Sequence, residues 1–247
     1  MAHDFTGTTN YAQKTPAVTG VPVSMFCHFY SDSLAATKPI IGLWTGAGSV
    51  DFIYMYTKSD SKFEVAIRGS TGPDTQAATS TNTVSTGTWY RALAVVTSSA
   101  QTVYIDGTKT AGGGVVTVPP AALDTLALAR DNFTRYLDGR IAEAAVWSAA
   151  LTDAEYASLN AGYSPMLIRP TSLVHYAPLL RGMTDRRGAA FSETGSGSVI
   201  EHPRVIYPRR KQTYATSVIG LLRENAGLGA MGGGPFARSN AGLGVLA

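Results

Sequence analysis

The order of strand and turn signals between Thr88 and Gly162 constrains the fold of this chain more than any other segment does. Residues 89–96 and 102–105 are rich in aromatic and β-branched side chains, which favour strands. Asp106-Gly107 follows directly and supplies the positive φ angles of a tight type I′ turn. The stretch therefore predicts a β-hairpin, and further strands are expected at residues 125–129 and 141–147.

A short helix is expected after the last of these strands. Thr152 is suited to the N-cap, and Glu155 follows at the spacing of a capping box. Leu151 and Tyr156 are placed as a hydrophobic staple, and Gly162 fits just past the C-terminus. The alternative is an unrelated hairpin followed by an unrelated helix.

Several phrases in this region resemble one family of folds. They are residues 103–107, 126–130, 137–141 and 149–155. These phrases are similar to the laminin-G-like, concanavalin-A-like jelly-roll family. Residues 5–12 and 26–34 resemble its first strands, although a carboxylate usual in the opening phrase is Thr here. The resemblance spans residues 1 to about 165 and implies an all-β fold, a two-sheet antiparallel jelly-roll sandwich with one short helix near 152–161.

The rest of the chain divides into two parts. Residues 173–179 resemble a strand that often begins related jelly rolls, so the segment 166–207 is expected to return to the sandwich and cover an open sheet edge. The predicted domain is thus 1–207, with a core at 1–165. Residues 208–247 are expected to form an extended, low-complexity C-terminal arm.

The arm repeats Asn-Ala-Gly-Leu-Gly at residues 225–229 and 240–244 and has too little apolar area to order itself. It is therefore expected to anchor the protein by lying against other chains of an assembly. The residues predicted to make these contacts are Arg209, Arg210, Lys211, Leu221, Leu222, Leu228, Met231, Phe236 and Leu243.

Composition excludes several classes of protein. The charged fraction of 15% is low against the usual quarter or so, and a net charge of +3 is too small to indicate a nucleic-acid partner. No segment approaches the apolar length of a membrane span, and the start lacks the pattern of a secretory signal. Synthesis in a host cytoplasm is expected. Cys27 is the single cysteine and is expected to be a buried free thiol.

No catalytic pattern accompanies the fold signature. The resemblance includes glycoside hydrolases, which need two carboxylates beside the scissile bond. No strand carries an alternating acidic pair, and Asp138 and Glu143 should fall on opposite faces of a regular strand. Nucleophile-elbow, phosphate-loop and paired-histidine motifs are also missing from the sequence. The sequence predicts a protein that is not an enzyme.

Two kinds of binding site remain as alternatives. Some laminin-G-like domains hold calcium, for which the carboxylates to inspect are Asp51, Asp131 and Asp138, although no cofactor or metal is expected. A glycan site needs exposed aromatic and hydrogen-bonding groups. The candidates for it are Tyr54, Tyr56, Phe133, Arg135 and Tyr136. The competing interpretation is that the tyrosines are half-buried strand residues.

The leading hypothesis is a structural virion protein of a phage or phage-like particle, either a capsid decoration protein or a tail or fibre component. Laminin-G-like domains without a secretion signal resemble those of phage virions. The expected partners are other virion proteins, reached through the arm, and further copies of the chain. The alternative is a carbohydrate-binding module that recognises a host surface glycan. A weaker third option is a hydrolase with an unrecognised site.

Overall fold

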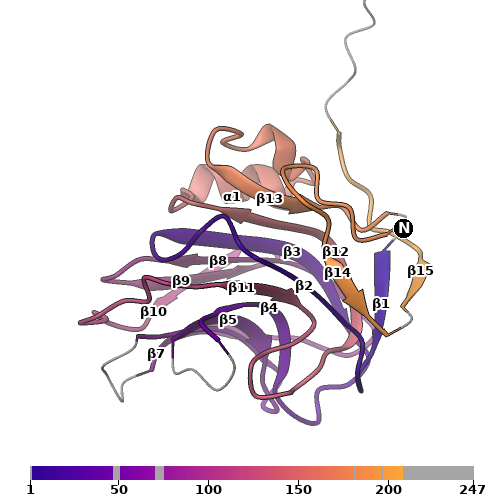
Figure 1. Cartoon of the computed structure of the whole chain (residues 1–247), viewed down its shortest axis with the longest axis horizontal. Helices are drawn as coiled ribbons and strands as arrows, with labels where there is room; N and C mark the ends of the chain where they lie inside the picture. Colours follow the sequence, from indigo (N-terminus) through magenta and orange to yellow (C-terminus); the bar gives the residue numbers. More distant parts are fainter. Residues whose placement is uncertain (1, 47–50, 70–74, 181, 196, 208–247) are drawn as a thin grey trace, which may run out of the picture. The chain divides into compact units, whose positions relative to one another are not determined.

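The computed structural model describes residues 2–46, 51–69, 75–180, 182–195 and 197–207. They form two antiparallel β-sheets packed face to face, with one α-helix on the outside of one sheet (Figure 1). The predicted jelly-roll sandwich is therefore confirmed. The arm expected at 208–247, including every predicted assembly contact from Arg209 to Leu243, lies outside the described residues.

One sheet, here called sheet A, has the strand order β10-β9-β8-β3-β12-β1-β15, and β13 also pairs with β12. Its strands are β1 (Ala2–Thr6), β3 (Val23–Ser31), β8 (Trp89–Val96), β9 (Gln101–Ile105), β10 (Thr108–Gly112), β12 (Asp138–Trp147), β13 (Leu173–Ala177) and β15 (Ser198–Ile200). The short strand β15 lies at one end of this order and β10 at the other.

The second sheet, here called sheet B, has the order β14-β2-β11-β4-β5-β6-β7. Its strands are β2 (Tyr11–Lys14), β4 (Lys38–Trp44), β5 (Phe52–Thr57), β6 (Lys62–Arg68), β7 (Gln76–Thr83), β11 (Thr125–Leu128) and β14 (Ser192–Thr194). The segment rich in Thr, Ser and Ala before Thr88 thus supplies the edge strand β7.

The main core lies between the two sheets, because alternate side chains of each strand point inward. Met25, Cys27 and Phe29 of β3 face Ile53 of β5 and Val65 of β6 across this space, and all are fully buried. Burial raises the pKa of the Cys27 thiol above its usual range. The cysteine is therefore a packing residue, as the sequence suggested.

The hairpin and the helix form as predicted. Asp106 and Gly107 both have positive φ, at 43° and 89°, and connect β9 to β10. Helix α1 (Asp153–Asn160) begins at Thr152, whose side chain and backbone complete the capping box with Glu155. A short 3₁₀ helix, η1 (Pro165–Leu167), follows α1. None of the described helices is both long and apolar enough to cross a membrane.

The returning segment is fastened to the start of the chain by one buried carboxylate. Asp185 accepts hydrogen bonds from Lys14 Nζ at 2.8 Å, His175 Nδ1 at 2.9 Å and the Tyr176 N–H at 2.9 Å. Burial acts to raise the pKa of Asp185, but the bonds from His175, Lys14 and the backbone hold it well below its usual range. His175 accepts from the Ala17 N–H, so it is a structural histidine.

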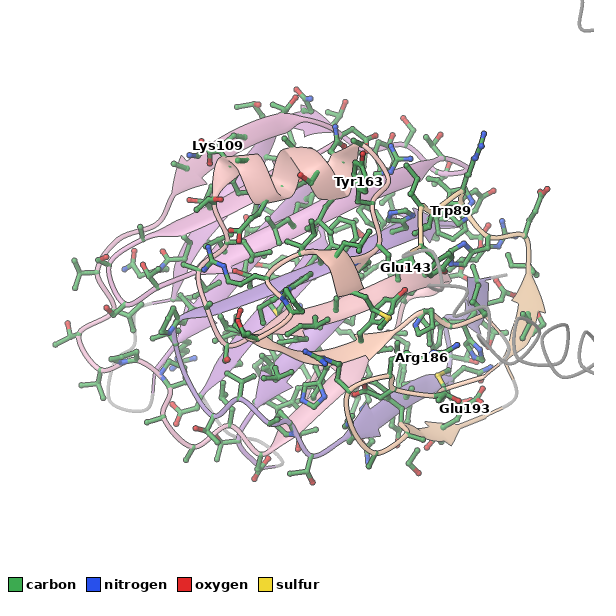
Figure 2. All side chains as sticks on the ribbon, turned by 90° about the horizontal axis from the view of Figure 1, so that it is seen from above. Trp89, Lys109, Glu143, Tyr163, Arg186 and Glu193 are labelled. Carbon is green, nitrogen blue, oxygen red and sulfur yellow. The ribbon has the colours of Figure 1, made fainter. Side chains whose placement is uncertain are left out.

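The expectation that Asp138 and Glu143 lie on opposite faces assumed a regular strand, and β12 is not regular. The pairing of β12 with β3 shifts register beside Glu143, whose φ is 56°, and such a β-bulge reverses the alternation of side chains. Glu143 (Figure 2) therefore turns to the outer face of sheet A. There it is buried and accepts hydrogen bonds of 2.6 Å from both the Tyr176 and the Tyr207 hydroxyl.

Candidate functional site

Aromatic rings gather on the outer face of sheet B, the face turned away from the core. We call this group, Trp44, Phe52, Tyr54, Tyr56 and Phe133, the aromatic face. Strand alternation places it, since the residues between them, such as Ile53 and Met55, point into the core. The Phe52 and Tyr54 rings stack at 4.4 Å with an interplanar angle of 8°.

Small residues beside Tyr54 leave room for these rings. In register across the sheet, Tyr54 is flanked by Gly42 and Ala127 on one side and by Ala66 on the other. A Cβ atom on Gly42 would lie 2.9 Å from the Trp44 ring and 3.0 Å from the Tyr54 ring. Glycine at this position therefore lets both rings lie against the strand.

The loop between β11 and β12 covers part of the aromatic face and is held by Asp131. This fully buried carboxylate accepts the Phe133 N–H and the Arg135 N–H, both at 3.0 Å, and pairs with Arg135 Nε at 2.5 Å. Thr134 at the tip has φ of 58°. The loop presents Phe133 to solvent with 52% of its surface exposed.

A groove of about 450 Å³ runs beside this loop over β2, β11 and β4. Its lining residues are Gln13, Trp44, Gly46, Asp124, Thr125, Arg130 and Asn132. Arg130 lies over the Tyr11 ring at 4.5 Å, and its Nε has no hydrogen-bond partner among the described residues. The groove thus combines one aromatic wall with polar groups that donate and accept hydrogen bonds.

The glycan-site candidates lie together around the aromatic face, although their roles differ. Tyr54 is buried, with 1% of its surface exposed, and donates to Asn132 Oδ1 at 2.5 Å. Tyr56 is half-buried and donates to Glu64. The Arg135 guanidinium lies 5.3 Å from the Phe133 ring centre. Phe133 and Arg135 are therefore open to a ligand, whereas Tyr54 supports the loop from below.

The remaining candidate of this set, Tyr136, lies beside Arg130, which lines the groove. Its ring centre is 6.1 Å from that of Tyr11, and it pairs with Arg130 through an isolated β-bridge. The Arg130 guanidinium lies over the Tyr11 ring. Tyr136 therefore belongs to the wall that positions Arg130.

The calcium candidates do not form one cluster. Asp131 is already occupied by two backbone N–H groups and by Arg135, Asp138 begins β12 beside Gly7, and Asp51 precedes β5. In the part of the chain that the structure describes, no group of three or more His, Cys, Asp or Glu side chains is placed to hold a metal ion.

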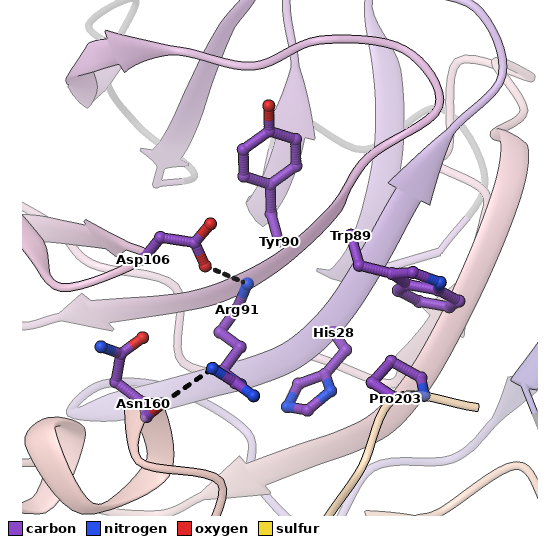
Figure 3. A pocket seen from close by; sticks show the side chains of 7 residues that line it. All are labelled: His28, Trp89, Tyr90, Arg91, Asp106, Asn160 and Pro203. Atoms are coloured by element: carbon purple, nitrogen blue, oxygen red, sulfur yellow. Dashed lines mark hydrogen bonds between the residues drawn. The ribbon is translucent and has the colours of Figure 1, made fainter.

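A second concave site, which the sequence did not indicate, lies on the outer face of sheet A (Figure 3). It is a cavity of about 290 Å³ lined by His28, Trp89, Tyr90, Arg91, Asp106, Asn160 and Pro203. These residues come from β3, β8, the hairpin turn, the end of α1 and the returning segment. Only strand pairing and helix packing bring them together, so no spacing in the sequence could have signalled this site.

Polar groups fix the shape of this cavity. The Arg91 N–H donates to Asp106 at 2.8 Å, and Arg91 Nη1 donates to the Asn160 carbonyl at 2.9 Å. His28 is buried opposite Arg91 in the register of β3 and β8. Burial, together with the charges of Arg91 and His202, lowers the pKa of His28 to about 3, so its imidazole is neutral at pH 7.

Comparison with known proteins agrees with this architecture. A family model described as "Concanavalin A-like lectin/glucanases superfamily" matches residues 6–157, more than half of the chain. No curated protein sequence matches the chain.

Three solved structures illustrate the similarity of fold. A heptameric SAP-like pentraxin from Limulus polyphemus has a TM-score of 0.58 at 16% identity, over 80% of this chain and 93% of that chain. A putative carbohydrate binding protein from Bacteroides ovatus has a TM-score of 0.61 at 18% identity, over 83% of this chain and 61% of that one. The CBM40 of a Ruminococcus gnavus sialidase, bound to α2,3-sialyllactose, has a TM-score of 0.50 at 10% identity, over 65% and 97%. At these identities the likeness concerns the fold alone.

Proposed function

The chain belongs to the concanavalin A-like lectin/glucanase superfamily, and from that premise we propose that it is a carbohydrate-binding module whose ligand lies on the outer face of sheet B. The observation that carries this proposal is the groove of about 450 Å³ beside the exposed Phe133. An aromatic ring with open surface stacks on the apolar face of a sugar. Gln13, Arg130 and Asn132 supply donors and acceptors for its hydroxyl groups.

Two of the similar structures favour a sugar as the first ligand class to test. The Bacteroides ovatus protein is described as a putative carbohydrate binder, and the Ruminococcus gnavus module was solved with a sialylated trisaccharide. Because their identity to this chain is low, they suggest the class of ligand and leave the particular sugar open. We expect part of a glycan chain to bind in this groove.

We propose that this site binds without catalysis. Glycoside hydrolysis needs two carboxylates on either side of the scissile bond. Among the described residues that line the groove the carboxylate is Asp124, whose oxygens accept the Gly46 N–H at 3.1 and 3.2 Å. The nearby Asp131 is buried under the loop and paired with Arg135. Asp124 and Asp131 therefore do not form the pair of free carboxylates that glycoside hydrolysis needs.

A glycan array followed by calorimetry tests the proposal, with Phe133→Ala as the decisive variant. Phe133 is the better choice than Tyr54, because replacing a buried ring would disturb the fold. We expect wild-type protein to bind a defined set of glycans and Phe133→Ala to lose about tenfold or more in affinity. Binding should survive EDTA, because the donors around Asp131 leave its carboxylate no room for calcium.

The matched control is Tyr163→Ala. Tyr163 is an aromatic residue with 44% exposure that follows α1 (Figure 2), away from sheet B. Its loss should leave glycan binding unchanged. The proposal fails if no glycan binds wild-type protein, or if the Phe133 and Tyr163 variants lose affinity equally.

The role of a structural virion protein is a second proposal, compatible with the first. It is supported by the sequence of residues 208–247, with its repeated Asn-Ala-Gly-Leu-Gly. In that proposal a homo-oligomeric, lectin-like body is carried on a phage or phage-like virion and anchored by the arm. Removal of residues 212–247 should leave a folded body that no longer incorporates into particles. Normal incorporation of the shortened chain would reject the anchoring role.

A further inference from the structure

The cavity on the outer face of sheet A holds polar atoms that the fold leaves without partners. His28 Nδ1, Arg91 Nε and Asn160 Oδ1 are all buried, and none has a hydrogen-bond partner among the described residues. His28 itself has 2% of its surface exposed. Buried polar atoms in native proteins are almost always hydrogen-bonded. Three unpartnered atoms around one cavity therefore indicate a ligand that bonds to them.

The chemistry of these atoms favours hydroxyl groups. Arg91 Nε is a donor, Asn160 Oδ1 is an acceptor, and the neutral His28 ring can serve as either according to its tautomer. A ligand that satisfies all of them must both accept and donate. A hydroxyl group does both, whereas an ionised carboxylate accepts only.

The charges of the cavity also balance. Arg91 contributes one positive charge and Asp106 one negative charge, and the two residues are joined through the Arg91 N–H. An anionic ligand would meet the Asp106 carboxylate and a cationic ligand would meet the Arg91 guanidinium. The arrangement therefore favours an uncharged ligand.

Size and shape narrow the class further. A volume of about 290 Å³ is at the lower end of the range for small-molecule sites. The half-buried Trp89 supplies an indole ring to the lining, and Figure 3 shows the Arg91 guanidinium between Asn160 and His28, with Trp89 and Pro203 beyond His28. One aromatic side and several hydrogen-bonding groups in a small cavity suit a single sugar ring.

We propose that this cavity is a second binding site, for one uncharged sugar ring such as the terminal residue of a glycan. It is separate from the groove on sheet B and shares no lining residue with it. Asn160 and Arg91 hold the hydroxyl groups, and Trp89 covers one face of the ring. The site exists whether or not the sheet B groove binds carbohydrate.

Asn160→Ala is the most informative variant for testing this site. It removes the unpartnered Oδ1 acceptor and leaves the Asn160 carbonyl, which accepts from Arg91, in place. The substitution should not lower the stability of the folded protein, because deleting a buried unsatisfied acceptor is neutral or stabilising. Loss of binding with an unchanged unfolding midpoint therefore reports a ligand contact.

The probes are D-glucose, D-galactose and N-acetyl-D-glucosamine, with D-glucuronate as the anionic comparison, titrated into full-length protein. NMR follows the Trp89 indole N–H and the Arg91 Nε–H. We expect at least one neutral sugar to shift both signals saturably, and Asn160→Ala to weaken that binding about tenfold or more. Phe133→Ala should leave it unchanged, which separates this site from the groove on sheet B.

Three results would overturn the proposal. The first is that no neutral sugar shifts either signal saturably. The second is that glucuronate binds more tightly than all three neutral sugars, and the third is that Asn160→Ala keeps wild-type affinity. None of these bears on the glycan-array result for Phe133→Ala, so failure of the second site can be told apart from failure of the first.

Discussion

Asp131 gives the sharpest test of how the loop beside the groove is built. Replacement by Ala removes the acceptor for the Phe133 and Arg135 N–H groups and the partner of the Arg135 side chain. Hydrogen bonds to a charged group contribute about 1.5–3 kcal/mol when buried. The donors lie in a surface loop where water can replace the carboxylate. Each of the two backbone hydrogen bonds is therefore expected to contribute about 1.5 kcal/mol, the lower end of that range.

The ion pair itself contributes little to the total. The Arg135 side chain is 40% exposed, and such pairs stabilise by about 0.2–1 kcal/mol. We therefore expect Asp131→Ala to lower the free energy of unfolding by about 3 kcal/mol. Asp131→Asn retains one carbonyl acceptor for the backbone N–H groups and should cost about 1 kcal/mol.

Urea denaturation of both variants checks these values, and the slope of the transition should stay constant because the buried core is unchanged. Glycan affinity should follow the same order, since the loop that Asp131 holds carries Phe133. Equal destabilisation by Ala and Asn would mean that the charge pair, and not the backbone acceptor, is the important interaction. A cost below about 1 kcal/mol for Ala would refute the assigned role of the carboxylate.

Three further predictions concern buried polar groups. Although burial alone raises the pKa of Asp185, its hydrogen-bond donors hold it well below the ordinary value of about 3.9. As the pH falls, the unfolded carboxyl therefore binds a proton before the folded one does. The stability that this group contributes is full above about pH 4 and is lost at lower pH. In urea titrations, the free energy of unfolding of Asp185→Asn should therefore fall less steeply with acid than that of the wild type. Cys27, whose thiol pKa is raised by burial, should react with a thiol reagent only after unfolding, and labelling of folded protein would contradict its placement. Tyr207→Phe removes one hydrogen bond to the buried Glu143 and should cost about 1.5 kcal/mol, with faster amide exchange after residue 200; unchanged exchange would exclude that bond.

Local signals in the sequence predicted local structure well. The residues that pair across the Asp106-Gly107 turn, and the two residues of the Thr152 capping box, are three positions apart in the sequence. The strand at residues 89–96 was predicted with the bounds that β8 has, since β-branched and aromatic residues mark it. These features depend on backbone preferences that a short window of sequence contains.

The features that the sequence did not predict depend on contacts between distant residues. The bulge at Glu143 reverses the alternation that every strand prediction assumes, and the Glu143 carboxylate bonds to two tyrosines that are distant in the sequence. The cavity on sheet A combines His28, Arg91 and Asn160, which no motif connects. Of the residues in the aromatic face, Tyr54, Tyr56 and Phe133 were candidates for a glycan site from the sequence, whereas Trp44 and Phe52 were not.

The two proposed sites occupy opposite sides of one sandwich, and this limits how a glycan can use them. Sheets packed face to face are about 10 Å apart before the outer side chains are counted. One sugar ring in the sheet A cavity therefore cannot reach the groove on sheet B, and a short oligosaccharide cannot fill both. Avidity within one chain requires a ligand that spans its two sites. A body with both sites occupied would instead hold two glycan chains, or two distant parts of one, so the affinities of the two sites should be independent of each other.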